Sequence, residues 1–469
     1  MIPVCVGESH SVSSDVDTSK KLFWIHTVGE SRYKSIVDDL ACRIRAGALP
    51  PGTQLPTIRS LMKRHGIALA TASRVYGELE AIGLVVGEAG RGTFVRDTSL
   101  PRGLGLEQSP ARSSAIDLTF NYPSLPGQAE LLRTGLRNLA ASGDLDALLH
   151  SAPQGGRSHE RQIVARHLRN RDIRVPGEQV LIVNGAQQGL AVTVMGLFQP
   201  GDILAIDALS YPGMKVLAQL HRLDLAPLPP RTGGGLDLEQ LDALCRRRPV
   251  RAIYTMPTLH NPLGLVMNKS DRIRLAELAE RYDFLIIEDS AYAFLAEPAP
   301  KPVFTHAPDR TIYVSGLSKS VAAGLRMGFV VTPKRLVPAL ERAIRVSTWN
   351  TPSLIVALAC QWIESGIVDT LEDQKRKDAH QRQLLARRIL RGGSIVAHPR
   401  SYYLWLEMPD DLRADRVAAN LERDGVLVTT AEPFSITPNI PHALRLALGS
   451  ISLDALDEAL HKVRRAVIG

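Results

Sequence analysis

The sequence predicts two folded units of different class, a small helical unit closed by a β-ribbon and a large α/β unit built on a mainly parallel sheet. Three observations lead to this prediction. Apolar residues recur at helical spacing within residues 33–82, a stretch rich in Pro, Gly and Ser and without aromatic residues occupies 97–115, and short apolar runs alternate with helical stretches after it. The chain has 469 residues, which is more than one hydrophobic core normally serves, so several domains are expected.

The domain boundaries follow from changes in composition. Residues 1–20 are polar, contain several Ser and Asp, and show no periodicity, so they are expected to form a disordered lead-in. The small unit is expected at residues 21–96, the flexible linker at 97–115 and the large unit at 116–469.

Composition also narrows the class of protein. No apolar run approaches the roughly 20 residues that span a bilayer, and the N-terminus lacks the apolar core of a signal peptide. We therefore expect a soluble, cytoplasmic protein without a membrane partner. The four cysteines form no CxxC pair, which argues against a disulfide framework or a structural zinc site, so no metal is expected.

The net charge is concentrated in the small unit. The chain carries a formal charge of +8, and residues 21–96 hold eleven Lys and Arg against six Asp and Glu. More than half of the positive excess therefore lies in less than a fifth of the chain, a distribution that permits nucleic-acid binding there.

The small unit has the pattern of three helices followed by two strands. Helices are expected at residues 33–44, 57–65 and 70–82. The second and third are short and are joined by a turn that contains glycine, which is the arrangement of a helix-turn-helix. Strands at 84–86 and 93–95 flank a glycine-rich turn and form a ribbon, or wing.

Several side chains of this unit stand where a helix-turn-helix meets DNA. Three lie on the N-terminal half of the third helix, where short polar and basic groups reach base edges in a major groove. One opens the second helix, where a guanidinium suits phosphate, and two form the wing tip, where glycine allows close backbone approach. Each charge taken alone is equally typical of a solvated surface, and the whole set is what favours DNA contact. The candidate residues are Arg59, Thr71, Ser73, Arg74, Arg91 and Gly92.

The motifs of this unit resemble those of the GntR winged-helix family. They are LPTIR at residues 55–59, ASR at 72–74 and GRGTFV at 90–95. The resemblance covers nearly the whole unit and implies a DNA-binding head. Because family members bind DNA as dimers, it also implies a double-stranded operator with twofold symmetry.

The large unit has strands that are apolar on both faces. Such strands are typical of a mainly parallel sheet covered by helices. The runs lie at residues 180–183, 203–206, 252–254, 284–287, 311–314 and 328–331. From about residue 335 a long helical stretch leads to a C-terminal α+β segment.

The string SGLSKSVAAGLRMG at residues 315–328 is the strongest motif in the chain. A lysine that forms a Schiff base needs small neighbours that leave room for the aldehyde, and Lys319, next to Ser318, has them. Arg326 lies seven residues further on and suits a phosphate dianion. A single loop lysine is more often solvent-exposed, but the combined pattern resembles the pyridoxal-phosphate lysine motif of fold-type I aminotransferases.

Further segments occur in the order of that family. They are NGAQ at residues 184–187, ALSYPG at 208–213, HNPLG at 260–264, IEDSAY at 287–292 and ALRLAL at 443–448. The resemblance implies a carboxylate at the pyridine nitrogen, two donors to the ring oxygen, a stacking tyrosine, a phosphate-binding turn and an arginine for a substrate or effector carboxylate. Besides Lys319, Ser318 and Arg326, it assigns Asp289, Tyr292, Asn261, Tyr211, Gly185, Ala186, Gln187 and, for the carboxylate, Arg445.

Each of these residues also has a structural interpretation, as a cap, a core aromatic or a salt-bridged arginine. Two departures from the family pattern stand out. His150-Ser-Ala-Pro replaces the usual Tyr-Gly-x-Pro stretch that contacts the phosphate of the neighbouring subunit, and Ala186 stands where a hydroxyl residue is common. Both weaken the expected phosphate cradle without abolishing it.

A GntR head, a linker and an aminotransferase-like body together resemble the MocR subfamily of regulators, over residues 30–465. The resemblance implies a mainly parallel seven-stranded sheet, bound pyridoxal 5'-phosphate and a transcriptional regulator. Such a regulator senses an amino compound through external aldimine formation at Lys319. It also implies a homodimer, with a head-to-tail domain-swapped arrangement as one form. Family effectors include γ-aminobutyrate, taurine, ectoine-derived diaminobutyrates and the cofactor itself.

Two alternatives stay open at this point. Lys319 has the chemistry of a proton-shuttling base, so the chain is also interpretable as an aminotransferase with an appended DNA-binding domain. The sensor is favoured over the enzyme because a metabolic transaminase gains nothing evident from the head. The other alternative is a regulator whose effector is pyridoxal phosphate itself.

Overall fold

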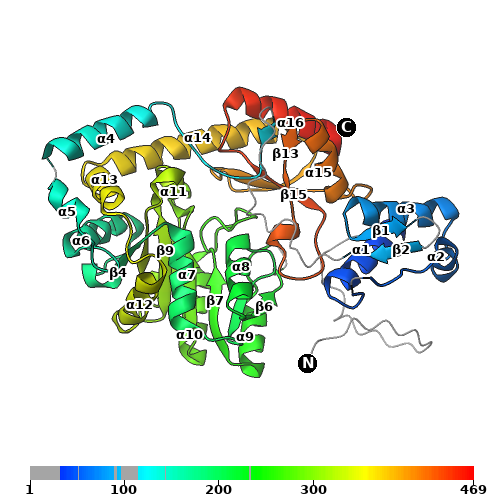
Figure 1. Ribbon diagram of the computed structural model, residues 1–469, viewed down its shortest axis with the longest axis horizontal. Coiled ribbons are helices and arrows are strands. Elements are labelled where there is room, and N and C mark those ends of the chain that lie inside the picture. The colour runs from blue at the N-terminus through cyan, green and yellow to red at the C-terminus, as the bar shows by residue number, and fades with distance from the viewer. Residues whose placement is uncertain (1–31, 51, 89–91, 97–114, 143, 232–233) are drawn as a thin grey trace.

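The structure, a computed structural model, describes residues 32–50, 52–88, 92–96, 115–142, 144–231 and 234–469. The lead-in expected at residues 1–20, Arg91 and residues 97–114 of the expected linker lie outside these residues. Figure 1 shows two units, a small one formed by the N-terminal elements and a large one formed by the rest.

The small unit, called the head below, consists of α1 (Arg32–Arg45), α2 (Ile58–His65), α3 (Leu69–Ala81), β1 (Val85–Glu88) and β2 (Gly92–Val95). Thr57 caps α2 by accepting a hydrogen bond from the Ser60 backbone N–H, and Gly66 ends it in the left-handed region at φ 60°. The two strands pair antiparallel, and apolar residues of all five elements share one buried cluster. The expected helix-turn-helix and wing are therefore present within a residue or two of their expected bounds.

The large unit, called the body below, is built on a seven-stranded sheet in the order β4-β10-β9-β8-β7-β5-β6. Only β10 runs antiparallel to its neighbours, so the sheet is mainly parallel, as expected. The strands are β4 (Val180–Val183), β5 (Ile203–Asp207), β6 (Asp224–Leu228), β7 (Val250–Thr255), β8 (Leu285–Asp289), β9 (Thr311–Gly316) and β10 (Gly328–Val331).

The edge strand β6 is the one that the apolar runs did not reveal. Asp224 and Pro227 on it are exposed, while Ala226 and Leu228 are buried, so its sequence alternates instead of forming an apolar run. An edge strand is covered on fewer sides than a central one and tolerates proline, which lacks the N–H that an inner strand must pair. The other six strands were recognisable as apolar runs because both of their faces are buried, and this includes β4, which is fully buried although it forms the opposite edge of the sheet.

Helices cover both faces of the sheet, and alternate strand residues point to opposite faces. In β4, Leu181 and Val183 pack in one cluster with α7, α8 and α12, whereas Val180 and Ile182 pack in another with α6 and α13. Under β5, β7 and β8 that second face is covered by α9 and α10. The helices are α4 (Gln128–Ser142), α5 (Leu145–Leu149), α6 (Ser158–His167), α7 (Ala186–Leu197), α8 (Pro212–Leu220), α9 (Leu238–Arg247), α10 (Lys269–Tyr282), α11 (Leu317–Ser320), α12 (Val337–Ser347) and α13 (Ser353–Glu364).

The long helix α14 (Ile367–Ile389) leads to a C-terminal layer of antiparallel strands and two helices (Figure 1). Its four-stranded sheet has the order β11-β12-β15-β14, and β3 pairs with β13 beside it. The elements are β3 (Ile116–Asp117), β11 (Ser394–Val396), β12 (Tyr403–Glu407), α15 (Ala414–Arg423), β13 (Val426–Leu427), β14 (Thr429–Thr430), β15 (Ala443–Ala447) and α16 (Leu453–Val467).

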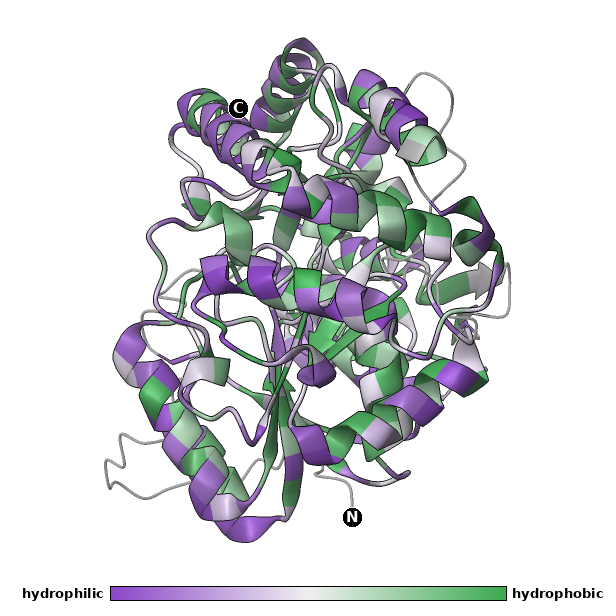
Figure 2. Ribbon diagram, turned by 90° about the vertical axis from the view of Figure 1, so that its left-hand side faces the viewer, coloured by the Kyte–Doolittle hydropathy of each residue, from purple (hydrophilic) through white to green (hydrophobic). Residues whose placement is uncertain are grey.

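Figure 2 shows the strands of the large sheet as largely apolar and the surrounding helices as apolar on one side and polar on the other. Within the described part of the chain, no single helix has both the length and the apolar composition to cross a bilayer. The pair α13 and α14 meets that criterion only when the two are taken together, and they are bent by 77° at the break between them.

Candidate functional site

A cavity of about 330 Å³ lies where the strands of the large sheet end and the C-terminal layer begins. Of the ten residues expected to bind the cofactor, nine line it, and so does Arg445. The remaining one, Gly185, is next to the lining residue Ala186 and packs against Arg326. Residues that are far apart in the sequence are therefore gathered at one place.

Asp289 ends β8 at the wall of this cavity and is fully buried. Its Oδ2 accepts a hydrogen bond from the Tyr254 hydroxyl at 2.8 Å, and its Oδ1 accepts one from the Ala291 backbone N–H at 3.0 Å. Burial raises the pKa of Asp289, and these two hydrogen bonds oppose that rise. A cationic group placed against the carboxylate would stabilise its charged form.

Lys319 lies in α11, which begins directly after β9. Its Nζ donates to the Asn121 carbonyl at 2.6 Å and lies 5.4 Å from the ring centre of Tyr122 and 5.6 Å from that of Tyr292. The amine is thus held at the cavity by groups that do not bond to it covalently, and it remains available to a carbonyl compound.

A turn that suits phosphate binding lies at the N-terminus of α7. Gly185 precedes the helix at φ 80°, and a Cβ at this position would lie 2.9 Å from Arg326 Nη2. Arg326 itself is held by a hydrogen bond from Nη2 to the Asn184 carbonyl at 3.2 Å. The free backbone N–H groups of a helix start and a nearby guanidinium are the usual partners of an anion.

Some polar atoms of the cavity lack partners within the described structure. The Ser318 Oγ and the Asn261 Oδ1 are buried and accept or donate no hydrogen bond. Gln187 differs, since its Oε1 accepts a hydrogen bond from the Tyr211 hydroxyl at 2.8 Å. Buried polar groups are costly unless they are paired, so a polar ligand that meets Ser318 and Asn261 fits this site.

Arg445 lies on β15 at the far side of the cavity, and its side chain is buried. Nη1 donates to the Thr119 carbonyl at 2.6 Å, while Nε has no partner within the described structure. The rings of Tyr403 and Phe434 flank the guanidinium at 5.3 and 5.8 Å. Burial lowers the pKa of Arg445, and the neighbouring Tyr292 and Tyr403 oppose this. A carboxylate would supply the missing acceptor.

Sequence reasoning missed three parts of this site. One is Tyr254, which lies within an apolar strand and gave no motif. Another is the segment 119–122, which follows the expected linker directly and contributes four lining residues. Its aromatic pair, Phe120 and Tyr122, stacks at 5.9 Å and was the available signal. The third is Lys375, a fully buried lysine on α14 that donates to the carbonyls of residues 123, 319 and 321 and so anchors the cofactor loop.

The region of His150, which departs from the family pattern, does not line the cavity among the described residues. His150 ends α5 and is exposed, and the neighbouring Ser151 lies 3.5 Å from Asn350. Any role for it in phosphate binding is therefore directed outward, away from the cavity of its own chain.

In the head, the side chains expected to contact DNA differ in exposure. Arg59, Ser73 and Gly92 are exposed and Thr71 is half-buried. Gly92 also has an internal reason to be glycine, since its φ is 118° and a Cβ there would lie 2.7 Å from the Gln54 side chain.

Arg74 is the exception, because its guanidinium is engaged within the head. It stacks 3.9 Å from the ring centre of Tyr33 and donates to the Tyr33 hydroxyl at 2.9 Å. The side chain is still about half exposed, at 49%. Base reading by Arg74 stays a prediction, and it requires this side chain to leave Tyr33.

A cluster of charges joins the head to the body, which lie side by side in Figure 1. Asp38 on α1 accepts a hydrogen bond from Arg413 Nη1 at 2.8 Å and lies 3.1 Å from His442 Nε2. Although burial acts to raise it, the contacts with His442 and Arg413 hold the pKa of Asp38 below its usual value. A second pair joins Glu78 of α3 to Arg416 at 2.8 Å.

The fold and the site define a class, a winged-helix DNA-binding head joined to an aminotransferase-like body. Residues 115–463 match the family described as aminotransferase class I and II, and residues 32–95 match the bacterial regulatory proteins of the gntR family. The chain belongs to the class I and II aminotransferase family and carries a GntR head. Pyridoxal phosphate is the cofactor of that aminotransferase class.

Relatives with the same two-part organisation are regulators. The chain is 26% identical over 435 residues to the uncharacterized HTH-type transcriptional regulator YdeF of Bacillus subtilis, covering 92% of this chain and 94% of that protein. It is 28% identical over 383 residues to the probable rhizopine catabolism regulatory protein MocR of Rhizobium meliloti, covering 75% of each. The expected resemblance to MocR-type transcriptional regulators is thereby confirmed.

Solved aminotransferases share the fold of the body. Kynurenine aminotransferase of Pyrococcus horikoshii superposes with a TM-score of 0.70 at 22% identity, covering 76% of this chain and 91% of that one. The α-aminoadipate aminotransferase LysN of Thermus thermophilus superposes with a TM-score of 0.68 at 23% identity, covering 76% and 93%. At these identities the likeness concerns the fold alone, and it confirms the expected α/β class.

Proposed function

We propose that the body binds pyridoxal 5'-phosphate through Lys319 and senses a small carboxylated amine in the same cavity, and that the head reports this as a change in operator binding. The supporting observation is that Lys319, Asp289 and Arg445 border one cavity of about 330 Å³. Cavities of about 300–1,000 Å³ are typical of cofactor and small-molecule sites.

Four side chains would hold the cofactor ring. When bound, the cofactor supplies an aldehyde carbon that amines attack. The buried carboxylate of Asp289, steadied by Tyr254, would face the pyridine nitrogen and keep it protonated. Tyr292 and Asn261 would donate to the ring oxygen, and Tyr211 would stack on the ring.

The phosphate would lie at the start of α7. The backbone N–H groups at the start of α7 point along the helix axis toward the position of the anion. Arg326 adds a guanidinium, and Ser318 adds a hydroxyl that has no partner within the described structure. The residues concerned are Gly185, Ala186, Gln187, Ser318 and Arg326. Ala186 supplies only its N–H, so Ser318 carries more of the hydroxyl role here.

Arg445 would select the effector. Its buried guanidinium has an unpaired donor, and burial strengthens any ion pair that it forms. A ligand with an amine for the cofactor and a carboxylate for Arg445 uses both ends of the cavity. This favours an amino acid over a simple amine as the effector of the cofactor site.

The contact between head and body offers a route for the signal. Arg413 is almost fully buried and touches both Asp38 of the head and Asp415 of its own layer. Glu432, in the loop between β14 and β15, pairs with Arg45 of α1 at 3.4 Å. Because β14 and β15 carry lining residues of the cavity, a movement of these strands on effector binding would change the contact between the head and the body.

The regulator would act as a homodimer on double-stranded operator DNA. Large apolar side chains are exposed on α4, on α5, just before α13 and on α13 itself, and α13 contacts both α4 and α5. They include Leu132, Leu136, Leu145, Leu149, Trp349 and Leu354. An apolar surface of this kind is typical of a subunit contact. A twofold body would place two heads on two half-sites.

The test compares regulation with catalysis in one preparation. Operator duplexes are selected from random DNA with the full-length chain, and their binding is followed by fluorescence anisotropy while amino acids and amines are titrated. We expect one amino compound to shift operator affinity without steady release of a keto acid. Steady turnover, at the roughly 10 per second of a typical enzyme, would instead establish the aminotransferase alternative. A shift produced by free pyridoxal phosphate alone would make the cofactor the effector.

A further inference from the structure

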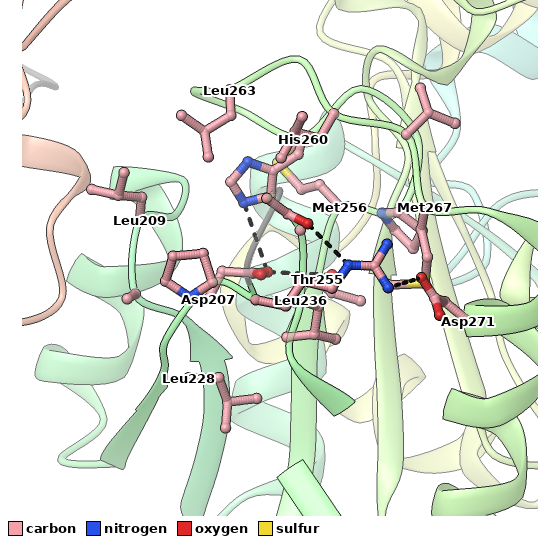
Figure 3. Close-up of a pocket in the computed structure, with 18 residues that line it drawn as sticks. Asp207, Leu209, Leu228, Leu236, Thr255, Met256, His260, Leu263, Met267 and Asp271 are labelled. Atoms are coloured by element: carbon pink, nitrogen blue, oxygen red, sulfur yellow. Dashed lines mark hydrogen bonds and ion pairs between the residues drawn. The ribbon is translucent and has the colours of Figure 1, made fainter. Parts of the chain in front are cut away.

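A second cavity, of about 170 Å³, lies beside the cofactor cavity at the carboxyl ends of β5, β6 and β7 (Figure 3). Most of its wall is apolar. The apolar side chains include Leu209, Leu228, Leu236, Leu263, Leu265 and Met267. None of the residues assigned to the cofactor lines it, and Met256 is the one side chain that lines both cavities among the described residues.

A carboxylate and an imidazole face each other in this apolar surrounding (Figure 3). Asp207 Oδ2 lies 3.7 Å from His260 Nε2, too far for a hydrogen bond, and accepts from the Thr255 hydroxyl at 3.3 Å. Within the described structure neither ring nitrogen of His260 makes a hydrogen bond of good geometry, although the Leu209 backbone lies close enough to act on the ring, and the residue is only 7% exposed. His260 therefore presents ring nitrogens without a hydrogen-bond partner beside the carboxylate of Asp207.

Burial acts on these two groups in opposite directions. Burial raises the pKa of Asp207, and the contacts with His260 and Thr255 act against this rise. Burial lowers the pKa of His260, and the contacts with Asp207 and the Leu209 backbone act against this fall. Near neutral pH the imidazole is therefore uncharged and offers a lone pair, and the carboxylate has no cation within hydrogen-bond distance. A buried carboxylate in this position is stabilised by a ligand that brings N–H donors and positive charge.

The mouth of the cavity argues against an acidic ligand. Arg231, the one Arg or Lys among the described lining residues, pairs with Asp271 at 2.8 Å and is thereby occupied. The volume is below the roughly 300 Å³ at which cavities for drug-sized ligands begin, so only a compact ligand fits. Leucine and methionine walls then favour a short aliphatic chain.

We propose that this cavity is a second ligand site, and that it binds a compact aliphatic amine whose ammonium group lies between Asp207 and His260. The chain of the amine packs against the leucines of the wall. This site is separate from the cofactor site of the proposed function, since it has its own charged pair and contains no lysine that could bond to a carbonyl.

The wall of this cavity continues toward the head. Leu209 forms a bridge with Ser435, and the Ser210 N–H donates to the Phe434 carbonyl at 2.8 Å. The same short segment contains Glu432, which pairs with Arg45 of α1. A ligand that contacts Leu209 therefore lies next to the loop that pairs with α1 of the head. Its binding is expected to alter the affinity of the protein for the operator.

The experiment uses the full-length protein with its cofactor bound and N,N-dimethylpropylamine as the probe. A tertiary amine forms no imine with an aldehyde, which separates this site from the cofactor, while its protonated form is positively charged and keeps one N–H that can donate to Asp207. Isothermal titration calorimetry should show saturable binding while the visible band of the cofactor stays unchanged. Isopentyl alcohol, similar in size but uncharged, should bind at least about tenfold more weakly because it brings no positive charge to the Asp207 carboxylate.

Two substitutions test the assigned groups. Asp207→Asn should weaken binding of the amine by about tenfold or more, since it removes the charge but keeps the shape. Asp224→Asn is the matched control, because this aspartate is exposed on the neighbouring strand and pairs with Arg248, and it should leave the affinity within about twofold. His260→Gln gives a second variant if the first does not fold.

The outcomes that overturn the proposal are distinct. Absence of saturable heat means that the cavity holds only water. Equal affinity for the alcohol and the amine, or undiminished binding by Asp207→Asn, means that the charged pair does not select the ligand. A change in the cofactor band with unchanged affinity of Asp207→Asn places the amine in the cofactor cavity instead. None of these results bears on whether Lys319 and Arg445 act as proposed.

Discussion

Replacing Arg445 by alanine should raise the concentration of effector needed to shift operator binding, while the cofactor stays bound. The guanidinium is buried on β15, uses one donor on the Thr119 carbonyl and leaves Nε without a partner within the described structure. A hydrogen bond to a charged group contributes about 1.5–3 kcal/mol, and about 1.4 kcal/mol corresponds to a factor of ten. Loss of one such bond therefore predicts a tenfold to roughly hundredfold rise in the midpoint for effector.

The assay is fluorescence anisotropy of a labelled operator at increasing effector, with the visible cofactor band recorded in the same samples. Arg445→Lys should recover only part of the response, because an ammonium group lacks the planar fork that pairs with a carboxylate. Arg251→Ala, at an exposed arginine whose Nη2 bonds to the Leu197 carbonyl, is the control. A parental midpoint in Arg445→Ala would refute the reasoning, since the effector would then lack a carboxylate or bind elsewhere.

Three further predictions concern the cofactor, the DNA and the contact between head and body. Lys319→Ala should abolish the visible band of the bound cofactor after dialysis, and a pyridoxyl group that stays covalently attached to the variant after borohydride reduction and dialysis would assign the attachment to another lysine. Arg74→Ala should reduce discrimination between operator and random DNA by about 1–3 kcal/mol in filter or anisotropy titrations, whereas Arg59→Ala should weaken both equally; a uniform loss for Arg74 would mean that it reads no base. Asp38→Asn should loosen the head, seen as faster proteolysis between head and body, while Asp39→Asn on the outer side of α1 should not. Folding lowers the pKa of Asp38, so its contribution to the stability of the contact between head and body is complete above the unfolded pKa of about 3.9 and is lost as pH falls through the folded pKa. The proteolysis rates of parent and variant should therefore differ at neutral pH and become equal in acid.

The local elements and the motif residues could be predicted from the sequence because their causes are local. A threonine at the start, a glycine at the end and a repeat of apolar residues defined α2 and its neighbours, and apolar runs defined six of the seven strands of the large sheet. The same holds for the string around Lys319, where small residues and Arg326 are close in sequence. Each of these signals acts within a few residues, so no knowledge of the fold was required.

What depends on contacts between distant residues was not predictable. Tyr254 bonds to Asp289 across 35 positions, and the segment 119–122 reaches Lys319 and Arg445 across more than 190, so no local pattern announces either contact. Arg74 illustrates the same limit, since its half-exposed side chain stacks on Tyr33 of another helix.

The sequence by itself determined the two fold classes and the chemical type of the cofactor site, because secondary structure and motif chemistry follow from neighbours along the chain. Only the tertiary structure decided which side chains share a cavity, that a second cavity with an incompletely paired Asp207 and His260 adjoins the first, and that Asp38 of the head meets Arg413 of the body. These are matters of packing between distant segments, and burial and pairing of charges arise only when the chain brings those segments together.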